Sequence, residues 1–336
     1  MLYFLVVYNR SWSTYILMIS WGEYDTDLTC KKKCFPCGLA PTFWSLNWVA
    51  AFMHLVNGVA TLGLWAASED RDNMYNLTET AAVWTNNAGT TDCSNGTLPD
   101  GATFSFQISE EFCISRVNKG TSRLSLWWLV IAFHMLSFVF QALSMFQWNI
   151  PCCGGRRCVR GSYVDEVDKA GTNVLRMVEY SVSATLMQIA IALVLGIWHR
   201  LVIVGIAFLT VVTMLLGLIA EQLKNDRKEI AWIAHLTGWV SLTGVWSIIG
   251  RQFFYTLQES GDNKPPEFVY IVLGVITILY CGFGLIQFVQ LWSSTPQNAP
   301  SFNRKIEMAY CLNSLTSKTF LGWILFANAL TGMAQS

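Results

Sequence analysis

The chain has 336 residues, of which 53% are hydrophobic and only 13% are charged, and its formal net charge at pH 7 is zero. Ordinary soluble domains carry about 25% charged residues, so this composition excludes a typical soluble protein and indicates a membrane protein with several spans. Membrane lipids are the expected surroundings, and the balanced charge gives no indication of a nucleic-acid partner, so none is expected.

Seven apolar segments are each long enough to cross a bilayer as a helix. They lack the alternation of strands, and lipid does not tolerate unpaired backbone groups, so helices are predicted. The expected fold is an all-α membrane protein with a seven-helix bundle. The segments are Phe43–Trp65, Leu124–Trp148, Thr172–Trp198, Leu201–Leu223, Ile230–Gln252, Phe268–Trp292 and Ile306–Thr331.

Residues 1–42 precede the first segment and form a separate N-terminal arm, so the seven-helix domain is expected over residues 43–336. Met1–Trp21 is apolar but is interrupted by Asn9 and Arg10. This pattern favours an interfacial helix or a poorly ordered leader. A cleaved signal peptide would need a basic start and a small-residue cleavage site, and neither is visible.

The loop over residues 67–122 follows the first segment and is expected to be extracellular. Cys93 and Cys113 are a candidate disulfide in an oxidising compartment. Thr103–Ile108 alternates and turns, which predicts a short β-hairpin. The loop also contains two acceptor sequences for N-glycosylation, Asn76-Leu77-Thr78 and Asn95-Gly96-Thr97.

The distribution of basic residues predicts the orientation in the membrane. Thirteen Lys and Arg lie on the side of the N-terminal arm and seven on the other side. The positive-inside rule then places the N-terminus in the cytoplasm and the C-terminus outside.

Six cysteines lie in the segments that are expected to be cytoplasmic. Their spacing matches no standard zinc pattern, and no loop histidine is near, so no metal site is predicted. Juxtamembrane cysteines beside basic residues are more typical of palmitoylation sites or free thiols. These residues are Cys30, Cys34, Cys37, Cys152, Cys153 and Cys158.

Two apolar segments contain charged residues at membrane depth. An unpaired ammonium there costs roughly 2.5–3.5 kcal/mol on insertion scales, so Lys318 should be neutral, paired or covalently used. Helical spacing groups two sets of polar residues on the third and seventh segments. The sets are Arg176, Glu179, Tyr180, Ser183 and Met187, and Tyr310, Ser314, Ser317 and Lys318.

Glu179 and Lys318 form an acid–base pair that a seven-helix bundle can bring face to face. Burial makes an amine nucleophilic enough to form an imine with an aldehyde, and the protonated imine then needs a nearby anion. Glu179 can supply that anion. The same spacing also fits a structural ion pair, or side chains that extend toward the headgroups.

The third and seventh segments together carry a family resemblance. Arg176-Met-Val-Glu179-Tyr180-Ser-Val-Ser183-Ala and Ser314-Leu-Thr-Ser-Lys318-Thr-Phe-Leu-Gly-Trp323 resemble the heliorhodopsins, a family of microbial retinal proteins with a cytoplasmic N-terminus. The surroundings of His54 and His134, and Phe268 through Gln287, resemble the same family.

The resemblance implies a rhodopsin-like bundle that holds all-trans retinal and forms a homodimer. Lys318 would carry the retinal Schiff base and Glu179 would be its counterion, with Ser183 and Ser314 near the imine. His54 and His134 would be proton sites in a polar cavity, although packing is the alternative for both. Further candidates for the pocket are Tyr180, Met187, Trp246, Phe283 and Gln287, and packing is equally plausible for Trp246 and Phe283.

Three functions are compatible with these residues, and none implies catalytic turnover. A standard outward proton pump is disfavoured because Ser314 and Ala190 replace the second carboxylate and the proton donor that pumps carry. A photosensor with an unknown signalling partner is the leading hypothesis. The alternatives are light-gated conductance of protons or other ions, through Glu221, Glu307 and the two histidines, and a seven-helix receptor or transporter without retinal.

Overall fold

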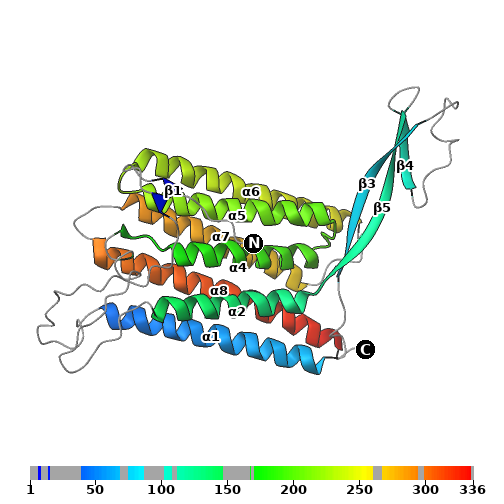
Figure 1. Ribbon diagram of the computed structural model, residues 1–336. Helices are drawn as coiled ribbons and strands as arrows, with labels where there is room; N and C mark the ends of the chain where they lie inside the picture. The colour runs from blue at the N-terminus through cyan, green and yellow to red at the C-terminus, as the bar shows by residue number, and fades with distance from the viewer. Residues whose placement is uncertain are drawn as a thin grey trace, which may run out of the picture.

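The computed structural model describes residues 7–8, 14–15, 39–68, 75–86, 102–107, 112–146, 167, 170–259, 267–293 and 299–333. In this part of the chain, seven long helices form a bundle, which confirms the predicted fold (Figure 1). Each helix contacts the next along the chain, and the last contacts the first, so the bundle closes into a ring. The helices are α1 (Leu39–Ala67), α2 (Leu126–Phe146), α4 (Val174–Val194), α5 (Arg200–Leu223), α6 (Lys228–Glu259), α7 (Glu267–Trp292) and α8 (Ala299–Met333).

Six of these described helices are long and apolar enough to cross a membrane, which supports a multi-pass membrane protein. The six are α1, α2 and α4 to α7, and α8 falls outside the set. Helix α8 has polar residues at its centre, among them Asn313, Ser314 and Lys318, which lower its mean hydropathy. Its polar composition marks the helix that carries the candidate chemistry.

A three-stranded antiparallel sheet projects beyond one end of the bundle (Figure 1). The predicted hairpin is present, as β4 (Ala102–Gln107) paired with β5 (Phe112–Leu124). Strand β3 (Tyr75–Asn86), which the sequence did not predict, pairs with β5 along its full length and enlarges the hairpin to a sheet in the order β3-β5-β4. Asn76 is exposed on β3.

Several expectations for the loops fall outside the described residues. Cys93 and Asn95 lie there, so the proposed disulfide has only its second partner, Cys113, within a described strand. Of Met1–Trp21, only β1 (Val7–Tyr8) and β2 (Thr14–Tyr15) are described, and they pair antiparallel. At these four residues the chain is extended and not helical.

The tight turn between the third and fourth segments joins the bundle to the sheet. Gly196, with φ +83°, lies in the left-handed region that glycine adopts at little cost, and this residue allows α4 to end just before α5 begins. The backbone N–H of Thr78 donates to the carbonyl of Trp198 at 2.9 Å. An exposed ion pair between Arg200 and Glu79 adds a second link, at 2.9 Å.

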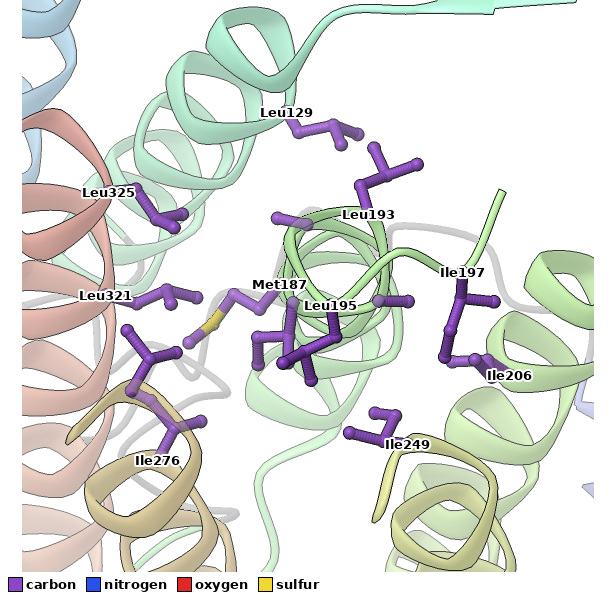
Figure 2. Close-up of a cluster of buried hydrophobic side chains, with 14 of the residues drawn as sticks. Leu129, Met187, Leu193, Leu195, Ile197, Ile206, Ile249, Ile276, Leu321 and Leu325 are labelled. Carbon is purple, nitrogen blue, oxygen red and sulfur yellow. The ribbon is translucent and has the colours of Figure 1, made fainter. Parts of the chain in front are cut away.

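The two halves of the bundle differ in polarity. The half toward the sheet is filled by a cluster of buried aliphatic side chains from α2, α4, α5, α6, α7 and α8 (Figure 2). Leu193, Ile206, Ile249 and Leu321 are completely or almost completely buried in it. The other half contains most of the buried charged side chains, among them Arg176, Glu221 and Glu307.

Candidate functional site

The site centres on an ion pair between Lys318 and Glu179, the acid–base pair that the sequence suggested. The ammonium of Lys318 on α8 contacts Oε1 of Glu179 on α4, and both side chains are buried, with 2% of each residue exposed. Ser137 of α2 accepts a hydrogen bond from Lys318 Nζ at 2.7 Å and donates to Glu179 Oε1 at 2.6 Å. A buried ammonium therefore has both a carboxylate and a hydroxyl as partners.

The local structure of α4 places the carboxylate. Asn173 caps the helix, because its side chain accepts a hydrogen bond from the backbone N–H of Arg176 at 3.0 Å. One turn after Glu179, Ser183 donates to Glu179 Oε1 at 3.1 Å, as the helical i, i+4 spacing allows. Hydrogen bonds to the charged carboxylate are stronger than neutral ones, so the anion is fixed in place.

A narrow cavity begins beside Lys318. A larger one continues toward α6. The two share a wall of Tyr180, Met214, Tyr280 and Phe283, so we treat them together as one slot. The narrow part is lined by Tyr180, Ser183, Ala184, Met187, Met214, Tyr280, Phe283, Ser314, Ser317 and Lys318.

The lining of the slot suits an elongated apolar molecule that ends in an aldehyde. Its aromatic walls direct their hydroxyls elsewhere: Tyr180 donates to the carbonyl of Tyr310 and Tyr280 to that of Ala184, both at 3.1 Å. Tyr180 and Phe283 meet edge to face at 5.2 Å between ring centroids. The slot thus offers an apolar polyene aromatic surfaces along its length and a primary amine at its end, which are the features that retinal requires.

Most pocket candidates from the sequence line this slot. Gln287 lines the larger part, and Tyr180, Ser183, Met187, Phe283 and Ser314 line the narrow part. Trp246 lines neither part. It contacts the slot residue Tyr280 edge to face at 5.8 Å and packs against the hydrophobic cluster.

Sequence reasoning missed several residues of the site, among them Ser137, His235 and Trp239. Ser137 is a partner of both charged groups, and its signal was its position three residues after His134, in the middle of an apolar span. His235 and Trp239 line the larger part of the slot. The position of His235 near the start of its segment gave no reason to select it.

The two mid-span histidines form a buried pair between α1 and α2. Nδ1 of His54 and Nδ1 of His134 are 3.2 Å apart, and each residue is only 1% exposed. One proton can be shared between the two nitrogens, so one ring donates and the other accepts. A Cβ added at Gly322, one turn after Lys318, would collide with Nε2 of His134, which shows how closely α8 approaches this pair.

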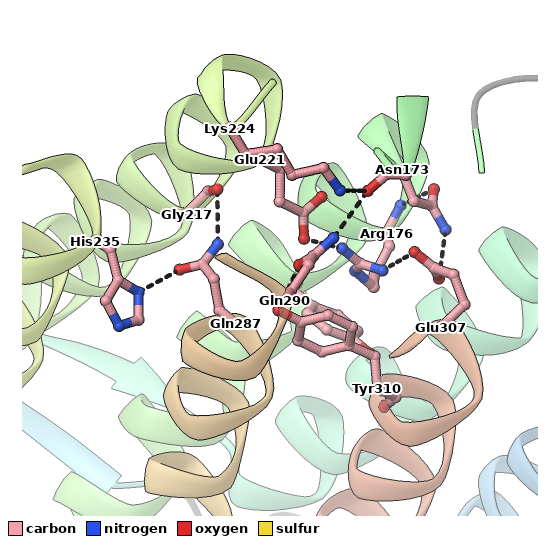
Figure 3. Close-up of polar contacts among 12 residues, drawn as sticks. Asn173, Arg176, Gly217, Glu221, Lys224, His235, Gln287, Gln290, Glu307 and Tyr310 are labelled. Carbon is pink, nitrogen blue, oxygen red and sulfur yellow. Dashed lines mark hydrogen bonds and ion pairs between the residues drawn. The ribbon is translucent and has the colours of Figure 1, made fainter. Parts of the chain in front are cut away.

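A second group of buried charges lies at the end of the bundle opposite the sheet (Figure 3). Arg176 of α4 forms ion pairs with Glu221 of α5 and Glu307 of α8, and all three are buried. Asn173 donates to Glu307 at 3.2 Å, and the guanidinium of Arg176 lies 3.9 Å from the centroid of the Tyr310 ring. One arginine therefore joins three helices.

A small polar cavity lies between the two charged groups. Glu179 lies in its wall together with Arg176 and Glu307, so the carboxylate beside Lys318 and the arginine cluster face the same space. The remaining lining residues are Asn47, Phe140, Gln141, Ser144, Asn173, Leu175, Tyr180 and Cys311. Such a polar space can hold water that connects the two charged groups.

Lys224, which directly follows α5, is buried beside this cluster. Its ammonium donates to the carbonyl of Gly171 at 2.7 Å, and the side chain of Gln290 donates to the same oxygen at 2.8 Å. Burial lowers the pKa of Lys224 from 10.5 to about 8, although the negative charge of Glu221 opposes the shift. Gly171, at φ +62°, allows the close approach, because a Cβ there would overlap Lys224 Nζ.

The lowered pKa of Lys224 predicts a pH dependence of stability. Between about pH 8 and pH 10.5 the unfolded chain binds a proton at this lysine that the folded chain has lost. The free energy of unfolding should therefore rise as pH increases through this range. Thermal unfolding in detergent should show this rise, and Lys224→Met should flatten it relative to Lys228→Met, which changes an exposed lysine. An equal slope in the two variants would contradict the assignment.

The same fold occurs in solved microbial rhodopsins. The transmembrane domain of the rhodopsin phosphodiesterase of Salpingoeca rosetta is 11% identical, covers 86% of this chain and 84% of its own, and has a TM-score of 0.53. A light-driven proton pump of Leptosphaeria maculans (9% identity, 87% and 96% coverage, TM-score 0.52) and the rhodopsin of Exiguobacterium sibiricum (14%, 86% and 95%, 0.52) are similar in the same way. At these identities the likeness concerns the fold.

Sequence comparison is more specific. No curated protein matches the chain in sequence. The sequence model of one family, Heliorhodopsin, matches residues 43–330, which run from the second turn of α1 to the last turn of α8 and include Glu179 and Lys318. Because this match covers most of the chain and the whole slot, the chain belongs to the heliorhodopsin family.

Proposed function

We propose that this protein is a light-sensing membrane receptor that holds all-trans retinal on Lys318 and signals through a change in the bundle. The observation that carries the proposal is the geometry of Lys318. Its amine lies at the end of an apolar slot and is paired with Glu179. Structural ion pairing alone would not require a slot beside the amine.

Each residue around the amine has a defined task. When bound, retinal supplies the polyene that absorbs light and isomerises. Lys318 holds it covalently and carries the positive charge, while Glu179 supplies the opposite charge. Ser137 and Ser183 keep the carboxylate in place through their hydrogen bonds. A movement of charge at Lys318 therefore changes the interactions of α2, α4 and α8 together.

The absence of a pump's second carboxylate and donor supports a sensor. Ser314 lines the slot one turn before Lys318, and Ala190 is completely buried in the apolar half. Neither can take up or release a proton. The hydrophobic cluster places mainly apolar side chains between Lys318 and the sheet.

The direct test is colour. The purified chain should gain an absorption band in visible light when all-trans retinal is added, and illumination should change that band reversibly. A preparation that folds but stays colourless with retinal would reject the proposal. It would favour a receptor or transporter without a chromophore.

Light-gated proton conductance is the second candidate, because the polar cavity connects Glu179 with Arg176 and Glu307. In a voltage-clamped cell a sensor should give no sustained photocurrent. A conductance should give a current that reverses with the proton gradient, and Glu307→Gln should reduce it several-fold by removing a charged partner from Arg176. Glu229→Gln, at an exposed site in the first turn of α6, is the matched control. A proton current that Glu307→Gln leaves unchanged would exclude this path.

We further propose a cytoplasmic N-terminus, an extracellular C-terminus and a homodimer. With α8 as the seventh span, the two ends of the domain lie on opposite sides, and the distribution of basic residues supports the direction. Glycosylation at the exposed Asn76 in a eukaryotic host would support an extracellular sheet. Modification of the N-terminal arm instead would contradict it.

A further inference from the structure

The larger part of the slot, which lies away from Lys318, is lined in part by side chains of α6 and α7. Three of its lining residues, His235, Trp239 and Gln287, are joined by hydrogen bonds. We propose that His235 is a positioning residue that fixes Trp239 and Gln287 as the end wall of the slot. It thereby determines which aldehydes fit and what colour the bound molecule has. This inference rests on the proposed function.

The hydrogen bonds define the state of the imidazole. Trp239 Nε1 is 3.0 Å from His235 Nε2, and an indole nitrogen can only donate, so Nε2 must be the acceptor. The proton of a neutral ring then lies on Nδ1, which donates to Oε1 of Gln287 at 2.9 Å. The amide nitrogen of Gln287 donates to the carbonyl of Gly217 at 2.8 Å (Figure 3).

The hydrogen bonds that run from Trp239 through His235 and Gln287 to Gly217 require one tautomer of His235 and one orientation of the Gln287 amide. A protonated imidazole would place an N–H group against the indole N–H, so the chain is complete only with neutral His235. The residue is buried, with 3% exposed. The bonds thus extend from α6 across to α7 and on to α5 without leaving a ring nitrogen of His235 unpaired.

The glycines beside the wall show how closely it is packed. A Cβ added at Gly284 of α7 would overlap the indole ring of Trp239, so the ring lies directly against the α7 backbone. A Cβ at Gly217 would come within 3.4 Å of the Gln287 amide nitrogen. Because Trp239 cannot retreat toward α7, its hydrogen bond to His235 sets the depth of the slot.

A wall at fixed depth selects its ligand by length and shape. The distance available between Lys318 and Trp239 is constant, and His235 and Trp239 direct their ring nitrogens to each other and to Gln287. The wall therefore favours an apolar ring at the end of the polyene. Loss of the His235 bonds should free Trp239 to turn and should make the slot tolerant of other aldehydes.

The test compares pigment formation with two aldehydes, all-trans retinal and an acyclic analogue that lacks the ring. The parent should prefer retinal. His235→Phe should shift the absorption maximum and reduce the preference roughly tenfold, because it leaves a buried indole N–H and an amide oxygen unpaired. Trp239→Phe should give the same change, and the double variant should add little to either one.

Conservative replacements of His235 separate the effect of its hydrogen bonds from the effect of its size. His235→Asn keeps an amide N–H near the place of Nδ1 and should restore the bond to Gln287. His235→Gln can place a carbonyl near Nε2 and should restore the bond from Trp239. Each variant should recover part of the parent's absorption maximum and of its preference for retinal. Both variants keep the test valid if His235→Phe does not fold. Gly284→Ala should slow pigment formation about tenfold or more, since Trp239 must move into the slot.

Thr237→Val is the matched control, because Thr237 lies on the exposed face of α6. It should match the parent in every measurement. If the parent forms a pigment that depends on Lys318, but the His235 variants keep its maximum and its preference, this inference is overturned and the proposed function stands. If the parent forms no pigment, both are overturned.

Discussion

Replacing Lys318 by alanine should abolish the visible absorption band completely, because no other lysine among the described residues lines the slot. Lys318→Arg should abolish it as well. Arginine keeps the positive charge beside Glu179 but does not form an imine under these conditions. The measurement is the visible spectrum after addition of all-trans retinal, with folding checked by size-exclusion chromatography.

The two variants should differ in stability. Alanine leaves Glu179 buried without its cation, and breaking a buried pair costs about 3–5 kcal/mol. Lys318→Arg should lose much less stability, because it keeps a positive charge beside Glu179. Lys305→Ala, which changes an exposed lysine on the same helix, should leave both colour and stability near those of the parent. A visible band that survives in Lys318→Arg would place the retinal elsewhere.

Glu179→Gln should have the second largest effect, because it removes the carboxylate that contacts the amine of Lys318. A unit charge pair about 4 Å apart is worth roughly 4 kcal/mol at an effective dielectric of about 20. That energy corresponds to about three pH units. As pH rises, the imine should therefore lose its proton, and with it the visible band, at a pH about three units lower than in the parent. Below that pH, the protonated imine should absorb at longer wavelength than in the parent.

A shorter carboxylate at position 179 tests whether the charge of Glu179 causes these two changes. Glu179→Asp keeps the charge on a shorter side chain, so both changes should be smaller. Glu229→Gln, at an exposed position, should change neither. A spectrum and a pH midpoint that stay the same in Glu179→Gln would show that another group balances the charge on Lys318. In that case Ser137 and Ser183 would no longer have a carboxylate to position.

Much of the fold could be predicted because each helix carries its signal locally. Seven apolar runs of sufficient length predicted seven helices, including α8, whose polar centre lowers its hydropathy. Strand β3 was missed for the opposite reason. Its pairing depends on β5, which lies more than 25 residues further along the chain, and its centre, Ala81-Ala82, has weak strand preference. A local pattern cannot reveal such a partner.

The site shows the same limit. Lys318 and Glu179 could be selected because a charge at membrane depth is costly and stands out from its neighbours. Ser137 could not be assigned a task, since a hydroxyl within a helix can bond to its own backbone, and the sequence does not show which helices meet. His235 was passed over for its position near a helix start, although the inward face of α6 brings it to the slot. Contacts between distant helices required the structure.

The apolar half of the bundle also gives the protein a sidedness. Mainly apolar side chains lie between Lys318 and the sheet, while the polar cavity lies on the side of Glu179 that faces Arg176 and Glu307. Protons should therefore exchange with the Lys318–Glu179 pair faster from the end of the bundle opposite the sheet. The colour of the pigment in a cell should respond more strongly to acidity at that end than to acidity on the sheet side.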